Sequence, residues 1–148
     1  MSITTFEPSK NYAQFASLVF PKVTATAKTV SSGTSTTPTW TAADILSGLI
    51  VVNTDDAGTA TFPTADLLAA AINGVTVGTS FDLWIRNTGD STLTVAAGTG
   101  GTLATGNTNT VLTVATRLFK FVITAVKVTA DPSTSNTYTV YTGPASAH

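Results

Sequence analysis

Threonine is the residue that most constrains how this chain can fold. It accounts for 32 of the 148 residues, and a further 20 are alanine and 11 are glycine. Threonine is branched at Cβ and stiff about χ1, so it favours extended backbone and suits the half-exposed side of a pleated sheet. The sequence therefore predicts strands over most of its length and a surface of small, uncharged side chains. Because such side chains lose little entropy on burial, this surface is suited to packing against other proteins.

Charged side chains are scarce and balanced. Only 10% of the residues are charged, and the formal net charge at pH 7 is −1. Binding to a phosphate backbone by charge needs a basic face, so we expect no nucleic-acid partner. We also expect no membrane partner, because there is neither a cationic amphipathic segment nor a run of about 18 apolar residues. Cysteine is absent, which rules out disulfides, thiol nucleophiles and cysteine-ligated metals.

Two short helices are predicted from their capping signals. Residues 41–47 begin with Thr41 as the N-cap and carry Asp44 at the third helical position, in the manner of a shortened capping box. Residues 64–73 begin in the same way with Thr64. Each segment is followed by a glycine, which favours the left-handed conformation that ends a helix.

Most of the remaining chain has the pattern of short strands separated by turns. The predicted strands are residues 22–30, 48–54, 59–62, 80–87, 91–96, 110–115, 117–128 and 137–141. We expect the turns at 55–58 and 88–90 to close two antiparallel hairpins, and a bulge near Phe119–Lys120 where the alternation slips. Without strand–helix–strand alternation or a long repeat, neither a parallel sheet nor a solenoid is expected. The fold class is predicted as all-β, a jelly-roll-like β-sandwich with two short helices and an N-terminal arm.

Residues 1–39 are predicted to be the N-terminal arm and a polar loop, and residues 40–148 the sandwich body. Large apolar side chains stand out in the otherwise polar arm: Phe6, Tyr12, Phe15, Leu18, Val19 and Phe20. They have little nearby to pair with, and exposed apolar surface of this size is a liability in water. We expect the arm to pack on a neighbouring subunit. The alternative is that it completes the sandwich of its own chain.

No catalytic or metal site emerges from the residue types. The only histidine is His148, the last residue, where no neighbouring group can orient it. Helix starts account for Asp44 and Asp66, and turns account for Asp55, Asp56, Asp90 and Asp131. Asp82 lies in the middle of a strand, with Arg86 four residues along on the same face, and we expect it to form an exposed cross-strand ion pair.

Two loops resemble ligand sites only superficially. Residues 53–56 offer oxygen ligands but lack the length and the bidentate glutamate of a calcium loop. Residues 98–101 are glycine-rich but lack the lysine and the following helix of a phosphate loop. We therefore expect no enzymatic activity and no cofactor.

The two tryptophans, Trp40 and Trp84, are the candidate interface residues of the body. Strand alternation puts Trp84 on the side opposite Phe81, Leu83 and Ile85. Interface anchoring is the leading hypothesis, because tryptophan is enriched at the energetic centres of interfaces. Stacking on a sugar and burial in the sandwich core are the alternatives.

Two segments carry a resemblance to a known group of proteins. They are TAADILSGLIVVNTDDAGTATFPTADLLAAA at residues 41–71 and VGTSFDLWIRNTGDSTLTVAAGTG at residues 77–100. This order of a capped helix, an apolar strand, Phe-Pro-Thr, a second helix, Gly-Thr-Ser-Phe and Asn-Thr-Gly resembles small β-rich capsid decoration or cement proteins. Such proteins belong to tailed bacteriophages and related double-stranded DNA viruses.

The resemblance implies a non-enzymatic virion protein that stabilises the head shell from the capsid surface and is made in the host cytoplasm. It implies a homo-oligomer, most often a homotrimer, whose partner is the major capsid protein. The arm is then expected to dock on a neighbouring subunit or on the shell. The alternative function is a carbohydrate- or receptor-binding module of a virion fibre or spike, in which Trp84 or Trp40 stacks on a sugar.

Overall fold

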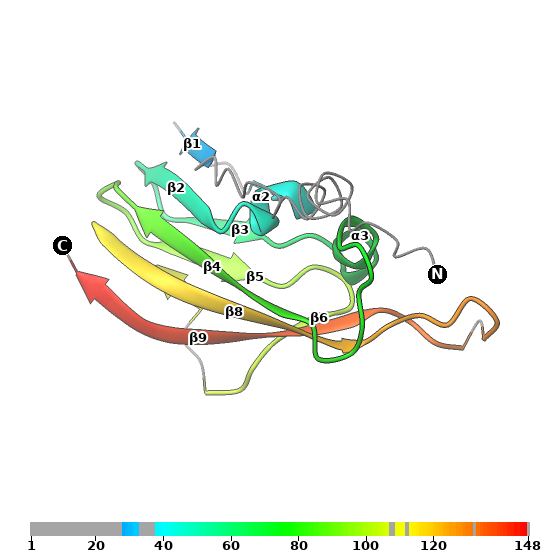
Figure 1. Cartoon of the computed structure of the whole chain (residues 1–148). Helices are drawn as coiled ribbons and strands as arrows, with labels where there is room; N and C mark the ends of the chain where they lie inside the picture. The colour runs from blue at the N-terminus through cyan, green and yellow to red at the C-terminus, as the bar shows by residue number, and fades with distance from the viewer. Residues whose placement is uncertain (1–27, 33–37, 107–108, 112, 132, 148) are drawn as a thin grey trace, which may run out of the picture.

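The structure is a computed structural model that describes residues 28–32, 38–106, 109–111, 113–131 and 133–147 (Figure 1). In chain order the elements are β1 (Lys28–Ser32), α2 (Ala42–Leu46), β2 (Leu49–Thr54), β3 (Gly58–Thr61), α3 (Ala65–Ala71), β4 (Ser80–Asn87), β5 (Leu93–Ala96), β6 (Gly101–Leu103), β7 (Thr110–Val111), β8 (Ala115–Ala125) and β9 (Thr137–Ala147). They form a six-stranded sheet in the order β1-β2-β4-β8-β9-β6 and a three-stranded sheet in the order β3-β5-β7. The prediction of a mostly-β fold with two short helices is confirmed. None of the helices in these ranges is long and apolar enough to cross a membrane.

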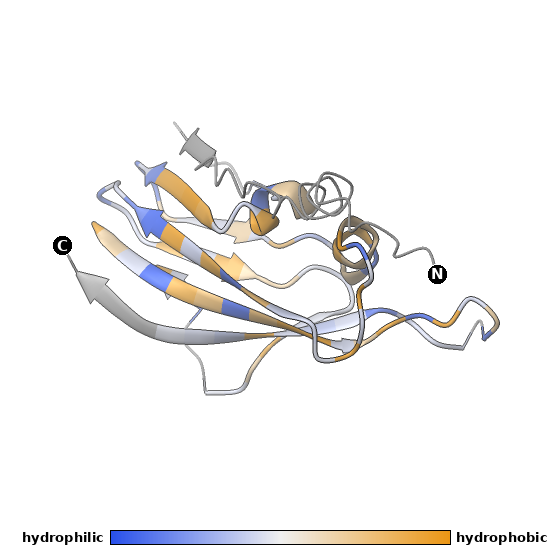
Figure 2. Ribbon diagram, viewed as in Figure 1, coloured by the Kyte–Doolittle hydropathy of each residue, from blue (hydrophilic) through white to orange (hydrophobic). Residues whose placement is uncertain are grey.

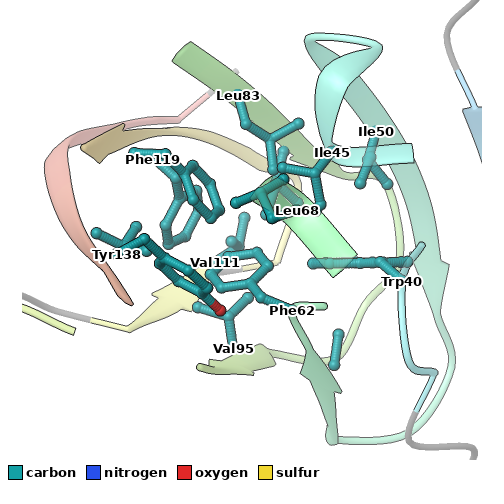
Figure 3. Packing of buried hydrophobic residues seen from close by; sticks show 14 of the residues in the cluster. Trp40, Ile45, Ile50, Phe62, Leu68, Leu83, Val95, Val111, Phe119 and Tyr138 are labelled. Atoms are coloured by element: carbon teal, nitrogen blue, oxygen red, sulfur yellow. The ribbon is translucent and has the colours of Figure 1, made fainter. Parts of the chain in front are cut away.

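One hydrophobic core lies between the two sheets. Its members come from both sheets and from both helices, among them Ile50, Leu83, Phe119, Phe121, Ala60, Val95, Val111, Ile45 and Leu68 (Figure 3). Phe62 stands at the centre, with its ring in edge contact with Phe119 and Phe121 at centroid distances of 5.8 and 4.9 Å. Buried residues alternate with more exposed ones along β4 and β8, so one side of each strand faces this core. Along β4 this follows an alternation of hydrophobic and mostly hydrophilic residues (Figure 2), whereas β8 turns Arg117 inward and Leu118 and Val122 outward.

The prediction that the turns at 55–58 and 88–90 close two antiparallel hairpins is wrong. β2 and β3 lie in different sheets, and so do β4 and β5, so each turn carries the chain from one sheet to the other. The two strand–turn–strand units, which we call arches, stack in parallel: Leu49 pairs with Trp84 and Gly58 with Leu93, both 35 residues apart. Four of the seven strand pairings between described residues are parallel, so the jelly-roll form is not confirmed.

The stack of arches continues on both sides of this pair. On one side Lys28 pairs with Ile50 and Thr39 with Thr61, again at a constant separation of 22 residues. On the other side β7 pairs with β5 and β8 with β4, both antiparallel. β1 therefore belongs to the six-stranded sheet, and Thr39 forms a parallel bridge to the end of β3. β1 precedes residue 40, where the sequence predicts that the body begins, and it pairs with β2.

Both helices begin at the predicted caps. The backbone N–H of Thr41 donates to Asp44 Oδ2 at 2.9 Å, and the Asp44 N–H donates to Thr41 Oγ1 at 3.2 Å, which completes a capping box. Thr64 Oγ1 accepts from the N–H of Leu67 at 3.3 Å. The prediction of helices near 41–47 and 64–73 is confirmed.

The C-terminal pair of strands differs from expectation in two ways. Inward and outward residues alternate along β8 without a break from Ala115 to Ile123, so the irregularity predicted near Phe119–Lys120 does not interrupt β8 itself. The register shifts instead opposite Leu118, where β9 accommodates an extra residue at Gly143–Pro144, and again at Thr124. β9 also continues to Ala147, well beyond the predicted end at residue 141.

Candidate functional site

The described residues hold no cluster of three or more histidine, aspartate or glutamate side chains that suits a metal ion. Asp82 forms the expected exposed cross-strand ion pair, at 3.2 Å, with Lys120 as its partner rather than Arg86. The reason is the register: Lys120 lies directly opposite Asp82 on the neighbouring strand, whereas Arg86 lies four residues along the same strand. Asp131 accepts from the backbone and side chain of Ser133, and these hydrogen bonds lower the pKa of its carboxyl. His148 lies outside the described residues.

The turn at 53–56 does not gather its oxygens around one point. The Asn53 side-chain amide donates to Asp55 Oδ1 at 3.3 Å. The Thr54 hydroxyl points into the molecule, 2.9 Å from Asn87 Oδ1 and close to the Ser91 carbonyl oxygen. Thr54 is thus used to join two arches and does not face a ligand.

The glycine-rich segment at 98–101 is packed against the core. A Cβ on Gly101 would lie 2.2 Å from Cζ of Tyr138, so only glycine allows this approach. The Tyr138 hydroxyl donates to the Pro63 carbonyl at 2.9 Å and accepts from the Gly98 N–H at 3.1 Å. Burial raises the pKa of Tyr138, while the hydrogen bond from Gly98 acts in the opposite direction. These glycines serve packing, and no phosphate cradle is formed.

Side chains in the stacked turns form a buried polar network that the sequence analysis missed. Asn87 is fully buried, and its Nδ2 donates to the Ser91 carbonyl at 2.6 Å. Its Oδ1 accepts from the Gly89 N–H at 3.0 Å. A buried asparagine needs such partners, and here they fix the turn that follows β4. The Asn-Thr pairs at residues 53–54 and 87–88 were the sequence signal from which this network could have been predicted.

The two tryptophans occupy opposite environments. Trp40 is 2% exposed and lies in the core beside Phe62, with a ring-centroid distance of 5.7 Å (Figure 3). Trp40 therefore lies in the core of the sandwich, which the sequence analysis gave as the alternative to an exposed interface anchor. Trp84 is 45% exposed and points away from the core, so burial in the sandwich core is excluded for it. The arm residues Phe6, Tyr12, Phe15, Leu18 and Phe20 lie outside the described residues.

Trp84 lies at the centre of the outward side of the six-stranded sheet, which we call the outer face. Its larger side chains are Leu49, Val51, Asp82, Trp84, Arg86, Leu118, Lys120, Val122 and Tyr141. Leu49, Trp84 and Leu118 are direct register partners on β2, β4 and β8, and they form an apolar row across the strands. The row ends at Gly143, where a Cβ would lie 3.3 Å from Leu118 Cβ.

Polar side chains flank this apolar row on both sides. The Asp82–Lys120 ion pair lies along one side, and Arg86 lies along the other, opposite Thr116. Tyr141, 48% exposed, lies beside Lys120 on β9. An apolar centre that holds a tryptophan, with a polar surround, is the usual composition of a protein–protein interface.

A second feature is a cavity of about 420 Å³ where β3 ends and both helices begin, which we call the helix-end pocket. Trp40, Phe62 and Pro63 form apolar walls, and Thr99 and Leu67 lie at its edge. Leu67 is 60% exposed, although it lies next to this apolar cavity. The Nε1 of Trp40 is buried without a hydrogen-bond partner.

The structure thus brings Trp84 together with apolar and charged neighbours that the sequence did not connect, and it separates Trp40 from them. Comparison with protein-family models, with curated proteins and with solved structures found no match to this chain.

Proposed function

We propose that this chain is a non-enzymatic structural protein whose outer face docks on another protein. The class that agrees best with the resemblance is a capsid decoration or cement protein, which binds the major capsid protein at the virion surface and stabilises the head shell. The proposal includes assembly as a homotrimer in which the arm residues Phe6, Tyr12, Phe15, Leu18 and Phe20 contact a neighbour. Production in the host cytoplasm belongs to the same proposal.

The apolar row of the outer face is the observation that carries the proposal. Strands are spaced by about 4.8 Å, so the row from β2 to β9 extends over roughly 14 Å, a suitable length for the centre of a contact. Trp84 is its largest member, and a tryptophan at an interface centre commonly contributes about 2 kcal/mol or more to binding. The Asp82–Lys120 pair and Arg86 supply a polar border. Docking through this face needs no change in the fold.

The edge strand β9 is poorly suited to pairing with a strand of another protein, which agrees with docking through the outer face instead. β6 pairs with β9 only from Tyr138 to Val140, so within the described residues the later part of β9 has a partner on one side. This part contains Pro144, which has no N–H to donate, and the register shift at Gly143. Proline and bulges at an edge strand oppose pairing with a further strand.

Antibody–gold electron microscopy of virions purified from the virus that carries this gene tests the proposal. We expect gold label on the heads of intact particles, and light scattering of the purified chain at three times the 15.1 kDa chain mass. Unlabelled particles together with a strict monomer in solution contradict it.

One observation favours the alternative of a carbohydrate-binding module. Asp82 and Arg86 lie two residues before and after Trp84 on the same face of β4, so polar groups flank an exposed aromatic ring. Sugar recognition combines such a ring with hydrogen-bonding side chains. A glycan array distinguishes the two functions, since a decoration protein gives no signal on it and a sugar-binding module gives one that Trp84→Ala removes.

A further inference from the structure

We propose that the helix-end pocket binds the N-terminal arm of a second copy of this chain, with Phe15 and Leu18 as the side chains that enter it. The inference rests on the proposed function, because it names the contact that joins copies of an assembling protein. It assigns the pocket to contacts between copies and leaves the outer face for the capsid partner.

The pocket has the shape and chemistry of a site for separate apolar side chains. Its volume of about 420 Å³ lies within the range of roughly 300–1,000 Å³ that is typical of ligand pockets. Its walls are apolar, and every residue that lines it is uncharged. Leu67 at the edge is 60% exposed and has apolar surface still to bury. A concave pocket of this kind suits single apolar side chains.

The arm offers side chains of that kind. Residues 11–20 contain no charged residue and carry Tyr12, Phe15 and Leu18 at intervals of three. This spacing places them on one face of a short helical turn, which is the pattern used by helices that bind in apolar grooves. An uncharged segment entering an uncharged pocket leaves no ion without a partner.

The length of the arm favours a second copy of the chain as the molecule whose arm fills the pocket. Phe15 precedes Lys28, the first described residue of β1, by 13 residues. At roughly 3.3–3.6 Å per residue, such a segment reaches about 45 Å. A body of about 120 residues is approximately 35 Å across, so a segment of this length is long enough to pass beyond its own body to an adjacent one. Lys28 at the start of β1 pairs with Ile50, which lies four residues after the end of α2 at Leu46. Repeated head-to-tail contacts of this kind can close into a ring such as a trimer.

Because the chain contains no cysteine, cross-linking can test the contact with the full-length protein. Two single-cysteine proteins are mixed, one with Ser17→Cys in the arm and one with Thr99→Cys at the pocket edge, and treated with a short bis-maleimide. The control mixture replaces Thr99→Cys by Asp90→Cys, an exposed position in the turn that joins β4 to β5. This turn lies at the end of the sheets away from α3 (Figure 1). A third sample carries Ser17→Cys and Thr99→Cys in one chain.

We expect a covalent heterodimer from the Ser17/Thr99 mixture and at most a trace from the Ser17/Asp90 mixture. A link confined to single chains of the doubly substituted protein overturns the inference in favour of the chain's own arm. Equal linking in both mixtures, or none, overturns it as well. Light scattering of the unmodified chain separates the two proposals. An oligomer that fails to link refutes only the arm contact, whereas a monomer at all concentrations also removes the proposed trimer.

A pair of surface variants gives a second readout. Leu67→Asp puts a charge at the pocket edge, and Val128→Asp puts one on a loop residue of similar exposure, 53%. Burying one leucine contributes enough that its loss weakens association about tenfold or more. We expect Leu67→Asp to raise the dissociation constant of the oligomer by at least that factor and Val128→Asp to leave it unchanged. Equal effects of the two variants overturn the inference.

Discussion

Gly89→Ala is the substitution that most directly probes the stacked arches. A Cβ at residue 89 would lie 2.2 Å from both the backbone nitrogen and oxygen of Thr54, in the turn of the neighbouring arch. The two turns must then separate by about 1 Å, because neither group is a flexible side chain. That shift lengthens the hydrogen bonds from Ser91 N to Thr54 O, now 3.1 Å, and from Thr88 N to Val52 O, now 2.8 Å. Losing both and straining the turn costs about 2–4 kcal/mol.

Urea unfolding followed by circular dichroism measures this cost. With an m-value of about 2 kcal/mol/M, the midpoint is expected to fall by roughly 1–2 M while m stays constant. Gly74→Ala is the matched control: Gly74 has φ +67° but nothing within 4 Å of a Cβ, so only backbone strain of about 1 kcal/mol is expected. If Gly89→Ala unfolds at the same urea concentration as Gly74→Ala or the unmodified chain, the turns are not stacked this closely.

Three further substitutions test other parts of the structure. Tyr138→Phe removes the hydroxyl bonded to Gly98 and should cost about 1–3 kcal/mol at neutral pH. Burial raises the pKa of Tyr138 above 10.0, so the contribution of this group to stability is complete below pH 10 and falls as the pH rises further. Urea midpoints measured between pH 9 and 11 should therefore decline less steeply with pH in Tyr138→Phe than in the unmodified chain, and equal declines in the two proteins argue against the burial of Tyr138. Val114→Asn should raise the unfolding free energy by about 0.5–1 kcal/mol, because Val114 is a β-branched residue at φ +46° and asparagine tolerates this backbone conformation better. A lower melting temperature of the variant in thermal unfolding contradicts this backbone geometry. Thr41→Ala removes the N-cap bonded to Asp44 and should lower the unfolding free energy by about 1 kcal/mol, and no change means that the cap does not form.

The elements themselves followed from local sequence signals. Thr41 and Thr64 predicted both helices because a capping hydroxyl acts within a few residues of itself. Alternation placed the strand at 80–87 and turned Trp84 outward, since it depends only on the period of the strand.

How the strands pair did not follow from these signals. An arch and a hairpin have the same sequence pattern, because in both cases the apolar residues of the two strands face a common core. The choice between them depends on which neighbour stacks on the turn, here Gly89 against Thr54, and that neighbour is 35 residues away in register. Trp40 shows the same limit: it directly precedes a helix cap and has no periodic partner, and only the pairing of Thr39 with Thr61 places it in the core.

The central claim is that the chain docks on a capsid through its outer face, and binding of Trp84→Ser to capsids tests it most directly. Virus particles stripped of loosely bound protein are mixed with the unmodified chain, with Trp84→Ser, or with Val128→Ser as a control of similar exposure, and then sedimented. Loss of a tryptophan at an interface centre costs about 2 kcal/mol or more, so we expect saturable binding of the unmodified chain and of Val128→Ser, and binding of Trp84→Ser weakened at least tenfold. Equal retention of all three proteins, or retention of none, contradicts docking through the outer face.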